Sequence, residues 1–305
     1  MRSFIIKRLL LLIPIFFGVS VLCFLILYFI PGVPAKIIAG EGATKEDIEN
    51  IRVVFGLDKP LYVQYLRFLR GIFTGELRSI KSGESILKEI APRYVGTIQL
   101  AFSSIIISST LGILLGVLAA VYKNSWIDNL AMAFALIGAS TPVFWLGLLL
   151  ILVFAVYLKV LPSGGREGFK SIILPALTLG LPSSAIVARL TRASMLDALS
   201  QDYIRTALAY GIPKRKVIFK YALKNALIPV VTVIGLQFGF LLSGAVLTES
   251  VFGWPGVGRY IVDAVFSRDY VVIEVGILIT AMTFVLVNTS VDLLYAVLDP
   301  RLRKG

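Results

Sequence analysis

The sequence predicts an all-α polytopic membrane protein with six transmembrane helices, cytoplasmic N- and C-termini and a helical external cap after the first helix. The chain has 305 residues, 57% of them hydrophobic, and a mean hydropathy of +0.88. That is far too apolar for a soluble globular protein. The apolar residues come in blocks of about twenty or more, which is long enough to cross a bilayer as a helix. These blocks occupy residues 9–30, 97–121, 130–158, 172–190, 228–247 and 271–298.

Residues 1–30 are expected to form the first transmembrane helix. Arg2, Lys7 and Arg8 precede an apolar run of about 22 residues, or roughly 33 Å as a helix. A signal peptide has a shorter apolar region that ends in small residues, so we expect this helix to be retained. Cys23 is the one cysteine of the chain, which excludes a disulfide within it.

Residues 31–95 differ from the rest because they are polar, mixed in charge and interrupted by turn residues. Helices are expected after Thr44, after Pro60 and from Ser85. A small external cap packed on the membrane domain is the favoured interpretation. A separate binding domain is the alternative.

Residues 96–305 are expected to form a five-helix core. Gly112 and Gly116 form one small-residue face, and Gly235, Gly239 and Ser243 form another; such faces allow close helix packing in membranes.

Three of the prolines inside the apolar blocks of this core are expected to break helices. Pro142 is expected to break the third block, and Pro175 and Pro182 are expected to break the fourth. Breaks are tolerated in membranes where neighbours or a cavity satisfy the freed backbone groups.

Residues 193–226, between the fourth and fifth blocks, are basic and compatible with helix. Such charges are costly in hydrocarbon, so the segment should lie in water at the membrane surface. The pattern predicts two short helices: Asp202 begins the first, Gly211 ends it, and Pro213 starts the second.

The distribution of basic residues predicts the orientation. The segments expected inside carry three times as many Lys and Arg residues as the two short outside loops. Both termini and residues 193–226 are therefore expected in the cytoplasm. Basic loops beside membrane lipid also explain the net charge of +12 better than a nucleic-acid partner, and no nucleic acid is expected.

The residues that enzymes use are missing from the sequence. It contains no histidine, which excludes His-ligated metal sites and Ser-His or Cys-His pairs. It contains no Gly-Lys dipeptide, so it has no phosphate-binding loop of the GxxxxGK[ST] type. We expect no catalytic, metal-binding or cofactor-binding residues, and any nucleotide would be bound by another subunit.

The basic segment also resembles a known family. ABC-importer permeases carry a cytoplasmic coupling loop with the pattern Glu-Ala-Ala, three residues, Gly, nine residues, Ile, one residue, Leu-Pro. Aligned on Gly211, this sequence matches at Ala207, Gly211 and Leu223. The sequence DYIRTALAYG…YALKNALIPVV is more similar to the dipeptide, oligopeptide and nickel branch of the family. In that branch the Glu of the pattern is lost and its proline comes later, here at Pro229.

The resemblance extends over nearly the whole chain and implies a multi-pass permease subunit of a bacterial dipeptide/oligopeptide importer in the inner membrane. It implies four kinds of partner: a second homologous permease, two cytoplasmic ATPase subunits, an extracytoplasmic substrate-binding protein and a peptide substrate. Nickel chelates, glutathione and oligosaccharides remain alternative substrates. The residues expected to contact the ATPase are Asp202, Arg205, Thr206, Ala207, Gly211 and Pro213.

Polar residues inside the apolar blocks are candidates for the lining of the transport pathway. They are Gln99, Gln237, Ser243 and Asn288. Simple interhelical hydrogen bonding would explain each of them equally well.

Two acids in the last block leave a different class of transporter open. An ion-coupled secondary carrier would use Glu274 and Asp292. Since both lie toward the ends of the block, bonding to neighbours in the bundle is the favoured explanation.

The segment ESVFGWPGVGRYIVDAVFSRDY, residues 249–270, is expected as an outside loop and resembles the corresponding loop of peptide permeases. There it faces the external binding protein, so Trp254 and Arg259 are candidates for docking that protein.

Overall fold

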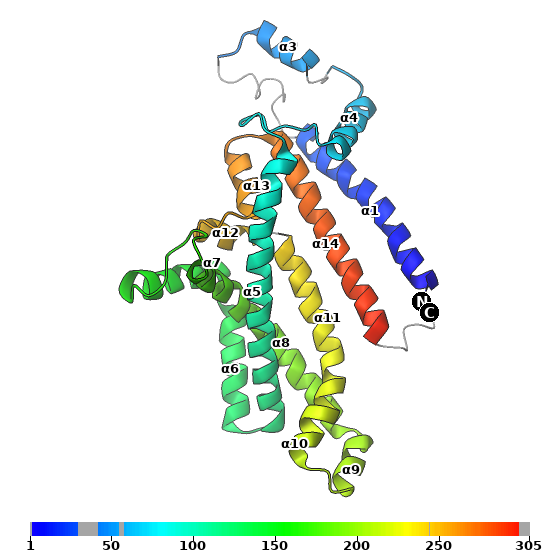
Figure 1. The fold of residues 1–305 in the computed structure, drawn as a ribbon, viewed down its shortest axis with the longest axis vertical. Coiled ribbons are helices and arrows are strands. Elements are labelled where there is room, and N and C mark those ends of the chain that lie inside the picture. Colours follow the sequence, from blue (N-terminus) through cyan, green and yellow to red (C-terminus); the bar gives the residue numbers. More distant parts are fainter. Residues whose placement is uncertain (1, 30–41, 55–57, 244, 299–305) are drawn as a thin grey trace.

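The structure is a computed structural model that describes residues 2–29, 42–54, 58–243 and 245–298. Helices dominate these residues, and no strand occurs among them. Five helices are long and apolar enough to span a membrane, and a sharply bent helix pair gives a sixth candidate (Figure 1). The five are α1 (Arg2–Phe29), α5 (Ile86–Val121), α8 (Lys170–Ser200), α11 (Leu223–Leu242) and α14 (Tyr270–Leu298). The predicted all-α membrane class is confirmed.

The bent pair corresponds to the third apolar block. Helix α6 (Trp126–Ser140) and helix α7 (Val143–Leu150), which continues as the π-helix η1 (Ile151–Tyr157), meet at 102°. Pro142 stands at the corner, where it lacks an amide hydrogen and disfavours helical dihedrals in the preceding residue. The predicted break is confirmed, but it is a corner rather than a kink in one straight span.

The predicted break of the fourth block is wrong. Helix α8 runs without interruption through Pro175 and Pro182. Pro175 is buried in the bundle, where the packing of α8 against its neighbours holds the helix in place, and prolines are tolerated in such bundled membrane helices.

Small residues bring α5 and α8 into close contact, as predicted. The two helices lie side by side (Figure 1). A Cβ atom at Gly112 would lie 2.5 Å from the Cβ of Val187, and one at Gly116 would lie 2.5 Å from the Cβ of Thr191. Neither position has room for a side chain unless the helices move apart.

The second small-residue face packs α11 against α14. A Cβ atom at Gly235 would lie 2.6 Å from Val291, and one at Gly239 would lie 2.9 Å from Oδ1 of Asn288. Ser243 is the C-cap of α11, and its hydroxyl donates to the Phe240 carbonyl at 2.7 Å.

The expected cap is helical, but its third helix is not separate. Helices α3 (Lys45–Val54) and α4 (Leu61–Thr74) follow the expected starts at Thr44 and Pro60. Ser85 instead caps α5, because the apolar residues Ile86 and Ile90 are buried and continue the membrane helix.

Helix α4 packs on α1. The Tyr65 hydroxyl lies 2.8 Å from Ser20 Oγ, and the Tyr65 ring lies 5.6 Å from that of Phe24. This contact agrees with a cap attached to the membrane helices. At the opposite end of α1, Arg8 forms an ion pair with Asp292 of α14 at 2.5 Å.

Residues 249–270 are not a loop. They belong largely to two short helices, α12 (Val246–Val251), which lies beside α7, and α13 (Val257–Phe266), which lies beside the start of α5 (Figure 1). We call this part of the molecule the α13 end. The opposite part, which carries α9 and α10, we call the α9 end.

Candidate functional site

The candidate coupling segment lies at the α9 end, between α8 and α11 (Figure 1). Its residues 193–200 form the last two turns of α8, and α9 (Asp202–Ala209) follows after the extended residue Gln201. A turn then leads to α10 (Lys214–Lys216), which Pro213 precedes as N-cap. The first helix therefore begins at Asp202, as predicted.

Gly211 ends α9 through two reversed hydrogen bonds. The amide of Gly211 donates to the Leu208 carbonyl at 2.9 Å, and the amide of Ile212 donates to the Ala207 carbonyl at 3.2 Å. This is the Schellman arrangement, which requires a left-handed residue at the position of Gly211. Its φ is +74°, as the prediction of a glycine turn requires.

The inner face of α9 is packed against the bundle. Ile204 and Ala207 are buried with Met195 at the end of α8 and with Val217 and Ala222. This apolar cluster makes α9 and the end of α8 one packed unit. Ala207 is therefore a packing residue whose side chain a partner subunit does not reach.

The outer face of α9 carries the remaining candidates. Asp202, Arg205 and Thr206 are exposed, and Asp202 pairs with Arg205 at 3.6 Å. Exposed pairs of this kind contribute little to stability. These side chains are instead available to a partner protein.

The second expected short helix is not separate. Helix α10 continues through the π-helix η2 (Val217–Ala222) directly into α11. Its exposed side is basic and surrounds Phe219, which is 57% exposed. An open hollow of about 650 Å³ is lined by Pro213, Arg215, Lys216, Phe219 and Lys220. A partner that fits here has acidic groups around an apolar contact.

Two of the four candidate pathway residues, Gln99 and Gln237, form side-chain hydrogen bonds to neighbouring segments. Gln99 is exposed at the α13 end and accepts from Arg166 Nε at 2.9 Å. Gln237 of α11 accepts from Ser108 of α5 at 3.3 Å and donates to the Ser183 carbonyl of α8 at 3.4 Å. The two Gln237 bonds join helices, which agrees with interhelical hydrogen bonding as the alternative explanation for this residue.

On α14, Asn288 lies one turn before Asp292 on the same face, whereas Glu274 lies about five turns before Asp292. Asn288 Oδ1 is buried against Gly239, and it has no hydrogen-bond partner among the described residues. Glu274 likewise has a buried oxygen without a partner in the described part of the chain. Asp292 pairs with Arg8, so the two acids form no shared site.

The α13 end buries Trp254. Its side chain is 1% exposed, and its indole nitrogen donates to the Gly96 carbonyl at 2.9 Å. The Trp254 ring therefore presents no surface to a binding protein. Arg259 is half-buried, and its Nε lies 3.8 Å from Oδ2 of Asp263. Of the two docking candidates, Arg259 is therefore the one with an accessible side chain.

Glu249 organises this corner, and local sequence patterns did not predict this role. The residue is fully buried; it accepts from Thr97 Oγ1 at 2.8 Å and from the Arg259 amide at 2.9 Å. A carboxylate beside the first amides of α13 stabilises that helix start. Burial nevertheless raises the pKa of the Glu249 carboxyl, although these hydrogen bonds partly oppose the shift. A Cβ atom at Gly256 or Gly258 would collide with the Glu249 carboxylate. These two glycines are the sequence signal that could have indicated the contact.

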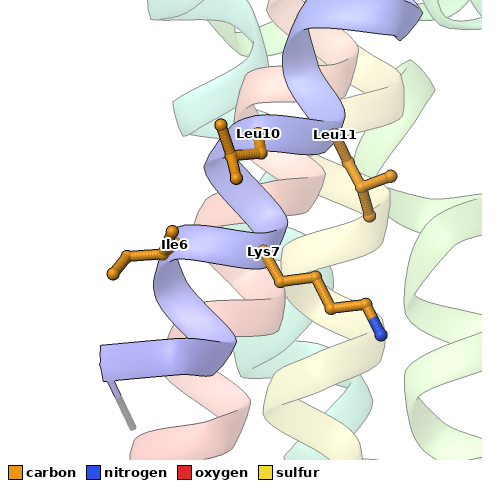
Figure 2. Close-up of a pocket in the computed structure, with 4 residues that line it drawn as sticks. All are labelled: Ile6, Lys7, Leu10 and Leu11. Carbon is orange, nitrogen blue, oxygen red and sulfur yellow. The ribbon is translucent and has the colours of Figure 1, made fainter.

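A second open hollow, of about 580 Å³, lies beside α1. Figure 2 shows the four side chains that line it, with the Lys7 amine extended away from Ile6. The lining consists of Ile6, Lys7, Leu10 and Leu11. Among the residues that the structure describes, no three His, Cys, Asp or Glu side chains come together as a metal site.

Two solved structures share this fold. One is titled "Inward facing conformations of the MetNI methionine ABC transporter: CY5 SeMet soak crystal form"; it matches with a TM-score of 0.60, 18% identity and coverage of 71% of this chain and 99% of that chain. Another, "Crystal structure of an amino acid ABC transporter with histidines", matches with a TM-score of 0.51, 18% identity and coverage of 71% and 93%. Over about 71% of its length the chain therefore has the fold of these ABC-transporter structures.

The family follows from the sequence matches. The chain belongs to the binding-protein-dependent transport system inner membrane components, whose model matches residues 112–304. A model for the N-terminal part of these membrane components matches residues 1–100. The resemblance found from the motifs is thereby confirmed.

Curated relatives cover nearly the full length. The chain is 47% identical over 304 residues to the glutathione transport system permease protein GsiC of Escherichia coli (strain K12). It is 46% identical to the protein of the same name from Shigella flexneri serotype 5b (strain 8401). In both comparisons the match covers 99% of each protein.

Membership of this family fixes the general activity. The chain is a multi-pass inner-membrane permease of an ABC importer, and the ATPase resides in a partner subunit rather than in this chain. Such a permease works with a second permease, ATPase subunits and a substrate-binding protein. The ion-coupled carrier considered from Glu274 and Asp292 does not agree with this membership.

Proposed function

We propose that this permease imports short peptides, with glutathione as the first candidate among them. The observation that carries the proposal is the 47% identity over 304 residues with a glutathione permease. Glutathione is itself a small peptide, so the proposal is compatible with the dipeptide/oligopeptide resemblance of the motifs. Nickel chelates and oligosaccharides are the alternative outcomes of the test.

The binding protein is proposed to supply most of the selectivity. The four polar candidates in the bundle are uncharged, and Gln237 is engaged in bonds between helices. They offer no compact set of charges that would recognise the two carboxylates and the amine of glutathione. Arg259 remains our candidate for receiving the binding protein at the α13 end.

The α9 end is proposed to face the cytoplasm, where the ATPase subunits would contact it and move it as they hydrolyse ATP. Its exposed residues Asp202, Arg205 and Thr206, the glycine turn and the basic hollow would contact the ATPase. In this arrangement residues 193–226 form the coupling segment within a core of residues 96–305. Residues 1–30 and 31–95 form the first span and the external cap, and both termini are cytoplasmic.

The test is uptake by the complete importer. The chain would be reconstituted in proteoliposomes with its second permease, ATPases and binding protein, and supplied with labelled glutathione, dialanine, trialanine or a nickel chelate. We expect ATP-dependent uptake of glutathione that an excess of unlabelled glutathione suppresses. Uptake of only dialanine or trialanine would replace glutathione by general peptides, and uptake of only the nickel chelate would contradict the peptide proposal.

A further inference from the structure

A buried ion pair joins the start of α6 to α8. Arg192 donates from Nε to Asp128 Oδ1 and from Nη2 to Oδ2, both at 2.7 Å. The Asp128 side chain is 4% exposed and that of Arg192 is 27% exposed. Such a two-point contact fixes the orientation as well as the distance of the two groups.

The Asp128 carboxylate also holds the turn between α5 and α6. Its Oδ2 accepts from the backbone amide of Asn124 at 3.0 Å, where the chain turns through a left-handed residue. Ser125 caps α6, because its Oγ accepts from the Asp128 amide at 3.4 Å. One side chain thus closes the turn and binds α8.

Arg192 lies close to the coupling segment along α8. The helix continues for eight more residues, about two turns or roughly 12 Å, to Ser200. In this stretch Met195 is buried against Ile204 of α9. A displacement of α9 must therefore pass into the part of α8 that Asp128 holds.

Helix α5 closes the arrangement from its other side. A Cβ atom at Gly116 would lie 3.0 Å from the Arg192 amide and 2.6 Å from the Ala188 carbonyl. Since α5 and α8 touch here and Asp128 connects α6, three membrane helices meet at Arg192.

We propose that the Asp128–Arg192 pair is a positioning element, which makes α9, α8 and the α5–α6 turn move as one body when the ATPases act. The proposal rests on the function proposed above for the α9 end. Without the pair, α8 slides relative to α6, and the movement of α9 is absorbed locally instead of reaching the membrane helices. ATP is then hydrolysed with less transport.

The test measures labelled glutathione imported per ATP hydrolysed by the complete importer in proteoliposomes. We expect Arg192→Gln and Asp128→Asn to lower this ratio at least about fivefold, the lower end of ordinary coupling between sites. Arg192→Lys, which keeps the charge but not the two-point contact, should recover part of the loss. Lys59→Gln removes an exposed pair with Asp58 and should leave the ratio unchanged.

The outcomes separate this proposal from the proposed function. If the binding protein does not stimulate ATP hydrolysis in the unchanged complex, the function at the α9 end is wrong. If the unchanged complex works and the assembled Arg192→Gln complex keeps its ratio, the positioning role is wrong. If only stability falls, the pair is a packing contact and the proposal is likewise overturned.

A variant that leaves neither charge of the pair unpartnered is less prone to misfolding, so it keeps the test informative. The double change Asp128→Asn with Arg192→Gln removes both charges, which avoids a buried charge without its partner. It should assemble and still show a lowered ratio. An unchanged ratio, or failure of this variant also to assemble, contradicts a role in positioning.

Discussion

Gly211 shows how one residue's backbone geometry can shape a functional segment. No atom outside the turn lies within 4 Å of a Cβ built at this glycine. The need for glycine therefore comes from its φ of +74° and not from crowding.

This geometry predicts the effect of replacing Gly211. Gly211→Ala should cost about 1–2 kcal/mol of local backbone strain, and Gly211→Val more, because the left-handed conformation is unfavourable for residues with a Cβ. We expect both variants to insert into the membrane and to lose ATP-dependent uptake, with Gly211→Val the weaker transporter. Membrane levels and uptake would be measured together. Normal uptake with Gly211→Val would contradict the coupling role of the turn.

Glu249 is the second residue whose surroundings determine its behaviour. The raised pKa means that the folded chain keeps the Glu249 proton to higher pH than the unfolded chain. As pH rises from the ordinary carboxyl range, the unfolded chain loses this proton first, and Glu249 progressively destabilises the folded state.

The prediction is a change in the pH dependence of stability. Glu249→Gln should flatten the decline in melting temperature that accompanies rising pH above about 4.5, the ordinary value for this carboxyl group. It should also lower the melting temperature itself, because the amide group cannot accept from both Thr97 and the Arg259 amide. Thermal unfolding of the detergent-purified chain at several pH values measures both effects. A pH profile identical to that of the unchanged chain would show that Glu249 does not titrate in this way.

At the scale of helices, small residues decide how α5 and α8 meet. Close approach at Gly116 leaves 2.6 Å between a built Cβ and the Ala188 carbonyl, a backbone atom that moves only with the helix. The position is therefore unsuited to even the smallest side chain.

A matched pair of alanine variants tests this contact. Gly116→Ala should destabilise the protein by about 1–3 kcal/mol, as overpacking does in other cores. Gly18→Ala on α1 adds the same methyl group where nothing lies within 4 Å, so it should be neutral or slightly stabilising. Thermal unfolding in detergent compares the two, and equal melting temperatures would contradict the close contact.

Helix ends show where the sequence was informative and where it was not. Asp202, Gly211 and Pro60 act through local backbone chemistry, so their roles were predicted. Two other features depend on packing with distant segments. Helix α8 continues through Pro175, and the helix expected from Ser85 is the first part of α5. Local sequence patterns do not indicate contacts with segments that are far away in the chain.

At the scale of the whole molecule, the apolar blocks were enough to predict a bundle of membrane helices. The burial of Trp254 and the bonds of Glu249 were not predictable, because Gly96 and Thr97 reach them from a segment about 150 residues away in the chain. The break at Pro142 was predictable, but its angle of 102° was not, because a proline interrupts a helix without fixing the direction of the next one.

The assembled importer should depend on ATP and not on an ion gradient. Uptake by proteoliposomes containing the complete importer should stop when ATP is omitted and persist when a protonophore is added. Asp292→Asn should leave the energy source unchanged, since Asp292 pairs with Arg8 at the end of α14. Loss of uptake with the protonophore alone would contradict this expectation.

The π-helix η2 has a consequence for the register between the coupling segment and the membrane. A π turn holds more residues than an α turn, so it acts as a single-residue insertion in an otherwise regular helix. Deleting one residue between Val217 and Ala222 would let this stretch relax into α-helix without shortening it by a full turn. Everything before it would then keep nearly the same direction, because the π-helix already absorbs the extra residue. If all the residues of η2 formed a regular α-helix instead, everything before them would rotate by about 100° about the axis of α11. The face of α9 that now points outward is thus set by a phase offset of one residue.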